Sequence, residues 1–331
     1  MMIRLLIAAG AGLLIQAAQA ADAKGPGTSA TGKAAVPAAR ATPPKADLPW
    51  ARTFSEAVAR ARAEKKLVMV DVYTDWCFWC KKLDEDTYPD PRVIKKAAQF
   101  VAVKINAERE GKENKDVAER YKVEGFPTIL FLDPGAGAGA EPKVEAKVGG
   151  YMPPGAFADR LDAIVEAHRD FPRLQALLAS RPNDLEVLGR LAALHFWRQD
   201  PKQAEALLDR GLKLDPENTQ GRLTRAINYL ADARLEAKGP EDAIPLYRKA
   251  ARTSKTAADA AYARSNVASC LLALGKPEEA VTELEAVIRI EGAPQEDKAQ
   301  ARSLIEKIRN LQERARSGED AADKGGKAGK S

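Results

Sequence analysis

The chain has 331 residues, of which 45% are hydrophobic, 30% charged and 6% aromatic. At about 150 residues per domain, this length predicts two globular units. The charged and apolar fractions exclude a polytopic membrane protein and a chain that is disordered throughout. A net charge of +5 is too weak over this length to indicate a nucleic-acid partner. With three Cys and two His, the sequence also excludes a disulfide-dense scaffold and a zinc site built from Cys clusters.

The first 48 residues predict a signal peptide followed by a linker. Arg4 precedes an apolar run that closes on Ala18-Gln19-Ala20, a pattern typical of signal peptidase cleavage after Ala20. Much of the run is Ala and Gly and no Lys or Arg cluster follows it, so cleavage is favoured over retention as a membrane anchor. Residues 21–48 are rich in Ala, Pro, Gly, Lys and Thr, which predicts an extended linker. We therefore expect residues 1–20 to direct export to an oxidising compartment.

Residues 49–170 alternate predicted helices and strands. Thr53 is expected to cap the first helix, whose apolar stripe consists of Phe54, Ala57, Val58 and Ala61. The predicted order is a helix over 53–65, a strand over 67–73, a helix from Cys77, a helix over 92–99, a strand over 100–105, a helix over 114–121, a strand over 128–132, a hairpin loop over 133–141, a strand over 143–148 and a helix over 154–168. This alternation predicts an α/β fold with a central mixed sheet and helices on both faces.

Cys77 and Cys80 are separated by two residues at the start of a predicted helix. Unpaired amide N–H groups at a helix start lower the pKa of the first thiol, and the second thiol lies one turn further, where it can attack a mixed disulfide. Cys77 is therefore the expected nucleophile and Cys80 the expected resolving thiol, with Lys81 and Lys82 adding positive charge nearby. Two alternatives stay open. Half of a zinc site would lack two ligands, and a permanent disulfide would gain little stability from closing so short a loop.

The residues around this pair resemble a known family. The segments Asp71-Val-Tyr-Thr-Asp-Trp-Cys77-Phe-Trp-Cys80-Lys, Lys104-Ile-Asn and Gly125-Phe126-Pro127-Thr128 occur in the order typical of the thioredoxin fold. More narrowly, about residues 50–168 are similar to the C-terminal periplasmic domain of the transmembrane thiol reductase DsbD and its soluble relatives. The resemblance implies a thioredoxin-like redox domain.

The resemblance also implies a substrate-binding surface. Pro127 would be a cis proline facing the active site, and the backbone of Phe126 would pair with an incoming substrate strand. An ordinary trans proline at the first position of a strand is the alternative. Trp76 is a candidate docking residue, whereas Trp79 is assigned no part in the chemistry. Packing is the alternative for both Trp rings.

Asp71 and Lys104 complete the predicted site. The resemblance implies that Asp71, six residues before Cys77, accepts and returns the proton of Cys80, and that Lys104 lies beside it. An Asp in an otherwise apolar strand is costly unless it is functional or paired, and burial should raise its pKa toward the range useful for proton transfer. The alternative for Asp71 is a partly exposed residue at the end of the strand.

The two residues between the cysteines are Phe78 and Trp79, so the pair encloses neither Pro nor His. A His there would stabilise the thiolate of a strong oxidant, so its absence favours a reductase or an electron relay. We expect partner proteins that carry disulfides or thiols, with a membrane thiol reductase as a candidate electron donor. We expect the periplasm of a Gram-negative bacterium as the location, and no cofactor, metal or nucleic acid at the site.

From about residue 171 the sequence is helical in character and self-similar. Small residues recur in pairs twelve residues apart, at Ala192/Ala204, Ala231/Ala243 and Ala268/Ala280. Successive pairs are 39 and 37 residues apart, close to the period of about 34 residues in tetratricopeptide repeats. We therefore predict an all-α domain of three such repeats over 171–316 that binds a protein or peptide, with a closing helix over 295–315. A loose tail over 317–331 is expected to follow.

The two His residues are assigned to structure or to the surface, and the third Cys is assigned to structure. His195 occupies a repeat packing position, and His168 follows the last helix of the first unit. Cys270 lies on a helix face between two apolar residues, which favours a buried, inert thiol over a partner for an external thiol.

Two functions from different classes fit these patterns. The first is an exported thiol–disulfide oxidoreductase of the protein-disulfide reductase type, whose repeats dock a protein partner. The second is an envelope scaffold that acts through its repeats while the thioredoxin fold is inactive or auxiliary. The intact Cys77-Phe-Trp-Cys80 motif favours the first function.

Overall fold

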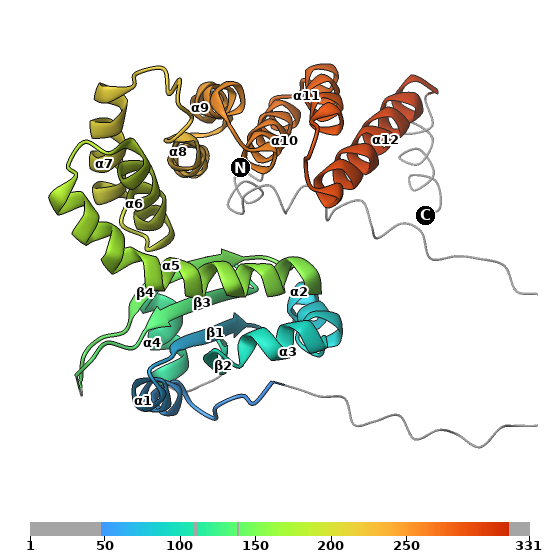
Figure 1. Ribbon diagram of the computed structural model, residues 1–331. Helices are drawn as coiled ribbons and strands as arrows, with labels where there is room; N and C mark the ends of the chain where they lie inside the picture. Colours follow the sequence, from blue (N-terminus) through green and yellow to red (C-terminus); the bar gives the residue numbers. More distant parts are fainter. Residues whose placement is uncertain (1–47, 109–111, 138, 318–331) are drawn as a thin grey trace, which may run out of the picture. The chain divides into compact units, whose positions relative to one another are not determined.

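The computed structural model describes residues 48–108, 112–137 and 139–317 (Figure 1). The signal peptide expected over 1–20, almost all of the expected linker and the expected tail lie outside these residues. The described residues divide into two compact units. The first comprises 48–175 with 197–200, and the second comprises 176–196 with 201–317. Among the described helices, none combines the length and the apolar character needed to cross a membrane.

The first unit contains every strand and helix that its sequence predicts. In chain order its elements are α1 (Phe54–Glu64), β1 (Leu67–Tyr73), α2 (Phe78–Lys82), the π-helical turn η2 (Leu83–Thr87), α3 (Pro91–Ala97), β2 (Phe100–Asn106), α4 (Lys112–Arg120), β3 (Thr128–Asp133), β4 (Lys143–Gly149) and α5 (Pro154–Ser180). The Thr53 side chain caps α1 by accepting the backbone N–H of Glu56, as predicted. The predicted apolar stripe of α1 is buried.

The last helix of this unit is longer than predicted. The sequence predicts an end near His168, but α5 continues to Ser180 with Pro172 in its interior. Pro usually ends a helix because it lacks an N–H group and its ring clashes with the preceding turn. Here Phe171 and Leu174 are buried on either side of Pro172, and their packing holds the segment in helical form.

The four strands form one mixed sheet, as predicted, in the order β2-β1-β3-β4. β1 pairs with β2 in parallel and with β3 in antiparallel fashion, and β3 pairs with β4 in antiparallel fashion. The register places Asp71 of β1 opposite Lys104 of β2 and Ile129 of β3. Two candidate site residues that are 33 positions apart in the sequence therefore become direct neighbours.

Alternating side chains give the sheet two apolar faces, each covered by helices (Figure 1). Met69 and Phe131 belong to one face, which packs with α3 and α5. Val70 and Leu130 belong to the other face, which packs with α1 and α4. The prediction of helices on both faces is confirmed. Because side chains alternate, Asp71 shares the face of Met69.

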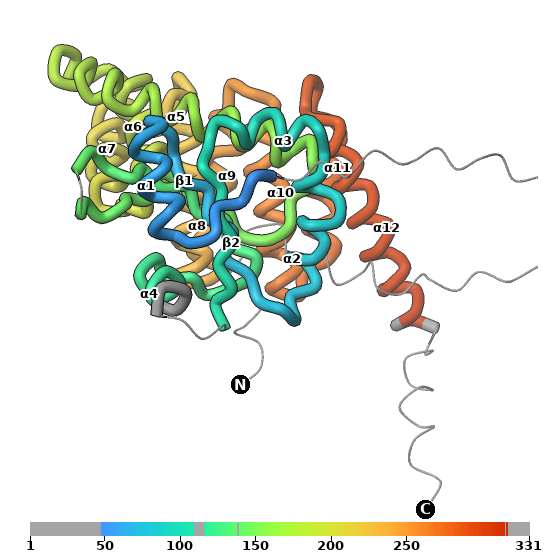
Figure 2. Tube along the Cα trace, turned by 90° about the horizontal axis from the view of Figure 1, so that it is seen from below, coloured from blue at the N-terminus to red at the C-terminus, as the bar shows by residue number. Residues whose placement is uncertain are grey.

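The second unit is entirely helical. Its helices are α6 (Leu185–Trp197), α7 (Pro201–Leu214), α8 (Thr224–Lys238), α9 (Pro240–Thr253), α10 (Ala257–Ala273), α11 (Pro277–Arg289) and α12 (Gln295–Ser317). From α8 onward each helix packs against the next one in the chain (Figures 1 and 2). The six Ala residues that define the predicted repeat spacing are fully buried. Small buried side chains let paired helices approach closely, which agrees with predicted repeats.

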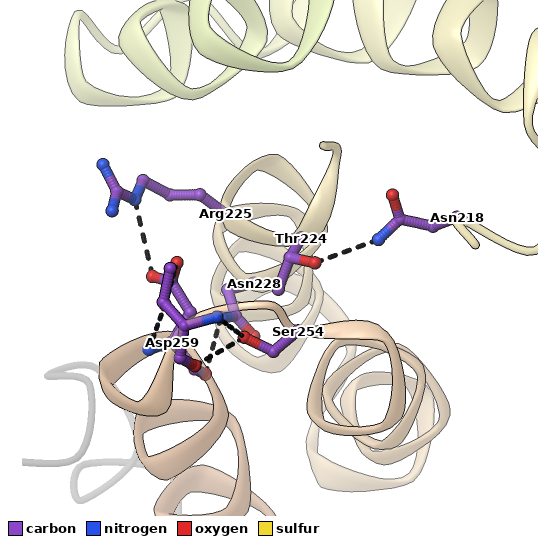
Figure 3. A network of polar contacts seen from close by, with 7 residues as sticks. Asn218, Thr224, Arg225, Asn228, Ser254 and Asp259 are labelled. Atoms are coloured by element: carbon purple, nitrogen blue, oxygen red, sulfur yellow. Dashed lines mark hydrogen bonds and ion pairs between the residues drawn. The ribbon is translucent and has the colours of Figure 1, made fainter. Parts of the chain in front are cut away.

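Polar contacts fix the junction between α8 and its neighbours (Figure 3). The side-chain amide of Asn218 donates to the hydroxyl groups of Thr224 at 3.0 Å and Thr253 at 2.8 Å. Arg225 of α8 forms an ion pair with Asp259 of α10 at 3.4 Å. These contacts join consecutive repeats of the second unit.

Candidate active site

Cys77 and Cys80 form a disulfide at the start of α2, and each is only 3% exposed. Cys77 is the N-cap residue of this helix rather than its first residue, and its Sγ accepts the backbone N–H of Cys80 at 3.1 Å. An amide dipole that points at a sulfur atom favours its ionised form once the pair is reduced. The role of Cys77 as nucleophile and that of Cys80 as resolving thiol stay predictions.

Two exposed aromatic rings flank the buried sulfur atoms. Trp76 is 67% exposed and Phe78 is 66% exposed. The Trp76 indole N–H donates to Glu108 Oε1 at 2.8 Å, and its ring forms a T-shaped pair with that of Phe126, with 6.1 Å between centroids. Trp76 is therefore both accessible and held in place, as a docking residue requires.

The ring of Trp79 packs against neighbouring aromatic rings. It lies 5.5 Å from the ring of Tyr151 and 5.1 Å from that of Phe78, between centroids. The Tyr151 hydroxyl in turn donates to Asp86 Oδ2 at 3.1 Å. Sequence reasoning considered Trp79 and missed the exposure of Phe78, because the packing of a distant loop decides which of these adjacent rings faces outward.

The predicted cis peptide bond between Phe126 and Pro127 is confirmed. The carbonyl oxygen of Pro127 accepts the backbone N–H of Gly150 at 2.8 Å, which joins this turn to the loop after β4. The Thr128 hydroxyl donates to the carbonyl oxygen of Gly125 at 2.7 Å and closes the turn from the other side. The turn is thus fixed next to Trp76, whose ring contacts Phe126.

Asp71 is completely buried, so the alternative of a partly exposed strand end is excluded. Burial raises the pKa of its carboxyl group to about 6, because a charge is poorly solvated in the protein interior. The positive charge of Lys104 opposes this shift, and the negative charge of Asp84 adds to it. The direction of the shift is the one predicted.

Lys104 lies beside Asp71, as predicted, with 3.4 Å between Nζ and Asp71 Oδ2. It also forms an ion pair with Asp84. Its ammonium group lies 5.1, 5.2 and 5.3 Å from the ring centroids of Trp50, Tyr73 and Tyr88. Burial alone would lower the pKa of Lys104, but the two carboxylates outweigh it and raise the pKa. Lys104 is therefore a fixed positive charge shared by two acids.

Sequence reasoning missed two residues of this cluster. Asp84 lies four positions after Cys80 and reaches Lys104 from η2. The spacing of one helical turn could have indicated that Asp84 and Cys80 share a helix face. Tyr88 is 1% exposed and meets Lys104 from beyond η2, and no sequence pattern signals that contact.

Comparison with known proteins agrees with this geometry. Residues 49–134 match a family model described as thioredoxin-like, and residues 162–226 match a model of the tetratricopeptide repeat. The chain contains a thioredoxin-like domain. This domain is similar in sequence to part of the thiol:disulfide interchange protein DsbD and is followed by tetratricopeptide repeats.

Two relatives illustrate the similarity. The thiol:disulfide interchange protein DsbD of Haemophilus influenzae (strain PittEE) is 35% identical over 112 residues, which are 33% of this chain and 19% of that protein. DsbD of Pseudoalteromonas atlantica is 36% identical over 105 residues, which are 32% of this chain and 17% of that protein. The chain thus spans less than a fifth of the length of these relatives.

Solved structures were compared as well. A thioredoxin from Thermus thermophilus is 30% identical, with 36% of this chain and 88% of that chain covered and a TM-score of 0.32. The oxidised C-terminal domain of Neisseria meningitidis DsbD is 20% identical, with 36% and 98% covered and a TM-score of 0.25.

A second polar cluster of the first unit lies outside the thioredoxin-like site. Glu145 is 6% exposed, its Oε2 lies 3.0 Å from His168 Nδ1, and the same oxygen contacts the Arg198 guanidinium group. Asp133, Glu145 and His168 are close enough to hold a metal ion, but Arg198 already neutralises the central carboxylate. The hydrogen bond to Glu145 raises the pKa of His168. These contacts agree with a structural His168.

Cys270 of the repeats is 1% exposed and carries no disulfide. Burial raises the pKa of its thiol to about 11, because the thiolate is poorly solvated there. The prediction of a buried thiol is confirmed, and its high pKa makes it a poor nucleophile at neutral pH.

Proposed function

We propose that the chain is an exported thiol–disulfide oxidoreductase that works as a protein-disulfide reductase or an electron relay. One observation carries the proposal: Cys77 and Cys80 form a disulfide at the start of a helix in a thioredoxin-like domain. The similarity to the thiol:disulfide interchange protein DsbD supports the same chemistry. The apolar run before Ala20 supports export, and we propose the periplasm as the location.

In the first step the reduced pair meets a substrate disulfide. The Cys77 thiolate attacks one sulfur of that disulfide, which forms a Cys77–substrate mixed disulfide and releases the other substrate sulfur as a thiolate. Trp76 and Phe78 flank Cys77 and supply apolar contacts to the partner. The backbone of Phe126, beside the cis Pro127, pairs with the partner segment.

The second step requires a base, which we assign to Asp71. Its carboxylate takes the proton of the Cys80 thiol, and the Cys80 thiolate attacks Cys77 Sγ. The Cys77–Cys80 bond forms, the mixed disulfide breaks and the second substrate sulfur leaves as a thiolate. Two electrons thus pass to the substrate. A pKa of about 6 leaves Asp71 ionised at neutral pH but close enough to it to bind a proton transiently.

The oxidised pair must then be reduced by another protein. A dithiol protein, for which a membrane thiol reductase is the candidate, attacks the Cys77–Cys80 disulfide and leaves oxidised. Lys104 holds Asp71 and Asp84 in place through the cycle. The repeats bind a protein partner and bring it to the redox pair.

Reduction of insulin disulfides by the full-length protein, with dithiothreitol as electron source, tests the proposal. We expect the wild type to accelerate the reaction and Cys77→Ser to abolish the acceleration, because the attacking thiolate is gone. Cys270→Ser is the matched control and should react like the wild type. Equal activity in wild type and Cys77→Ser would rule out the mechanism.

Trapping of mixed disulfides in the Cys80→Ser variant distinguishes a reductase or relay from a scaffold. The match of residues 162–226 to tetratricopeptide repeats is the observation that favours a scaffold. In Cys80→Ser the mixed disulfide cannot resolve, so a reductase or relay accumulates partners that dithiothreitol releases. A scaffold captures the same partners in wild type and Cys77→Ser, and none of them through a disulfide.

A further inference from the structure

The carboxyl group of Asp71 lies among buried polar atoms that complete no hydrogen bond. Both Asp71 oxygens and the Tyr88 hydroxyl are in this state, although Lys104 forms an ion pair with Asp71 at 3.4 Å. Buried polar groups are almost always hydrogen bonded, so an unsatisfied group often has a functional explanation. Both groups lie around Lys104, whose Nζ is 3.4 Å from Asp71 Oδ2 and 5.3 Å from the centroid of the Tyr88 ring.

The ring of Tyr88 is held next to Asp71 from several sides. It packs against Trp50 with 5.1 Å between centroids and against Phe157 with 5.8 Å, while Lys104 Nζ lies 5.3 Å from its centroid. The hydroxyl approaches Asp71 closely enough to lower the pKa of the carboxyl group, against the larger effect of burial. Burial and then Asp71 raise the pKa of Tyr88 well above its usual value, so the phenol keeps its proton.

We infer that Tyr88 is a positioning residue for the proton that Asp71 exchanges with Cys80. The inference rests on the proposed oxidoreductase function. A phenol both donates and accepts, so its O–H donates to the Asp71 carboxylate before the transfer. Its oxygen accepts from the carboxylic acid afterwards. Tyr88 itself is neither oxidised nor deprotonated.

Neither of the two charged side chains that act on Asp71 in the described part of the chain can serve both of its protonation states. Lys104 on β2 favours only the ionised form, and Asp84 on η2 favours only the protonated form. The Tyr88 hydroxyl can turn to suit either form without moving its ring. Its removal therefore shifts the balance between these forms.

The experiment compares full-length wild type with Tyr88→Phe, which deletes only the hydroxyl. Carboxyl carbon NMR of the oxidised protein follows the titration of Asp71 directly. We expect Tyr88→Phe to raise the pKa of Asp71 by about one unit, since the variant removes the hydroxyl that lowers this pKa in the wild type. Tyr121→Phe is the matched control, because its buried hydroxyl donates to the Pro142 carbonyl oxygen at 3.1 Å on the opposite face of the sheet.

Kinetics provide the second readout. In Tyr88→Phe the acidic limb of the pH–rate profile for insulin reduction should move upward with the pKa of Asp71, and in an Asp71→Asn background Tyr88→Phe should leave the profile unchanged. An unmoved Asp71 titration in a folded Tyr88→Phe protein overturns the inference. If the wild type reduces no disulfide, the proposed function fails, and the titration still decides the role of Tyr88.

Discussion

At the scale of single residues, Asp71 carries an energetic cost as well as a proposed role. Burial raises the pKa of its carboxyl group from 3.8 to about 6, so the folded protein holds this proton more tightly than the unfolded chain. Between these values the native state binds more protons, and stability falls as the pH rises. At neutral pH the cost reaches about 3 kcal/mol, and it vanishes below about pH 4.

This cost predicts a pH-dependent gain in Asp71→Asn. The neutral amide matches the protonated acid in shape, so we expect the variant to be more stable than wild type by about 3 kcal/mol near pH 8 and equal to it below about pH 4. Urea unfolding of the oxidised proteins at both values measures the difference. A stability difference that does not change with pH would contradict the buried carboxylate. In turnover the same variant should accumulate the mixed disulfide, because Cys80 loses its base.

At the scale of helices, glycine is required where the backbone of a neighbouring segment comes too close to leave room for a Cβ atom. Gly189 is buried in α6, and a Cβ atom there would lie 2.3 Å from the backbone carbonyl oxygen of Arg222. At Gly211 in α7 a Cβ atom would meet only the end of the Leu223 side chain, at 2.7 Å. At Gly155 in α5 the nearest atom is Arg92 Nη1 at 3.5 Å, an ordinary contact.

These three positions predict a graded series of Gly→Ala variants. We expect Gly189→Ala to destabilise the second unit by about 3 kcal/mol, since a backbone carbonyl cannot move aside as a side chain can. Gly211→Ala should cost less, about 1 kcal/mol, because the end of the Leu223 side chain can shift further than a backbone carbonyl. Gly155→Ala should stabilise its helix by about 0.5 kcal/mol through helix propensity. Thermal unfolding of each variant gives the order, and a Gly189→Ala protein as stable as wild type would contradict this close approach.

Local signals predicted most helices and strands, because caps and apolar periods act over a few residues. Thr53 capped α1 as expected, and the apolar run of β1 lies where the sequence predicts it. The end of α5 could not be predicted, since packing around Pro172 outweighs the local preference against Pro. The length of α5 is set by tertiary contacts.

Site residues that belong to one short sequence motif could be predicted. Contacts between segments that are far apart in the sequence could not. The Cys77–Cys80 pair followed from one short motif, whereas the cis Pro127 was expected from the family resemblance. The contacts of Tyr88 with Lys104 depend on the geometry of η2, a π-helical turn that the sequence does not signal.

At the scale of the whole molecule, each unit has its own apolar core. The sheet of the first unit is buried between two clusters of side chains, and the helices of the second unit bury two others. Units with separate cores can unfold in separate transitions, so a single free energy does not describe the chain. Cys77 and Cys80 both belong to the first unit.

Paired variants test this independence. Asn218 is fully buried, adopts φ +50° and bonds Thr224, Thr253 and the Leu223 N–H, so Asn218→Ala should destabilise the second unit by about 3 kcal/mol. Leu130→Ala empties a fully buried position of the first core and should cost about 3 kcal/mol there. Calorimetry of the full-length proteins should show each variant lowering one transition only. At about 25 °C the Asn218→Ala protein should reduce insulin at the wild-type rate, because Cys77 and Asp71 belong to the other unit. Loss of both transitions together in either variant would show that the units fold as one.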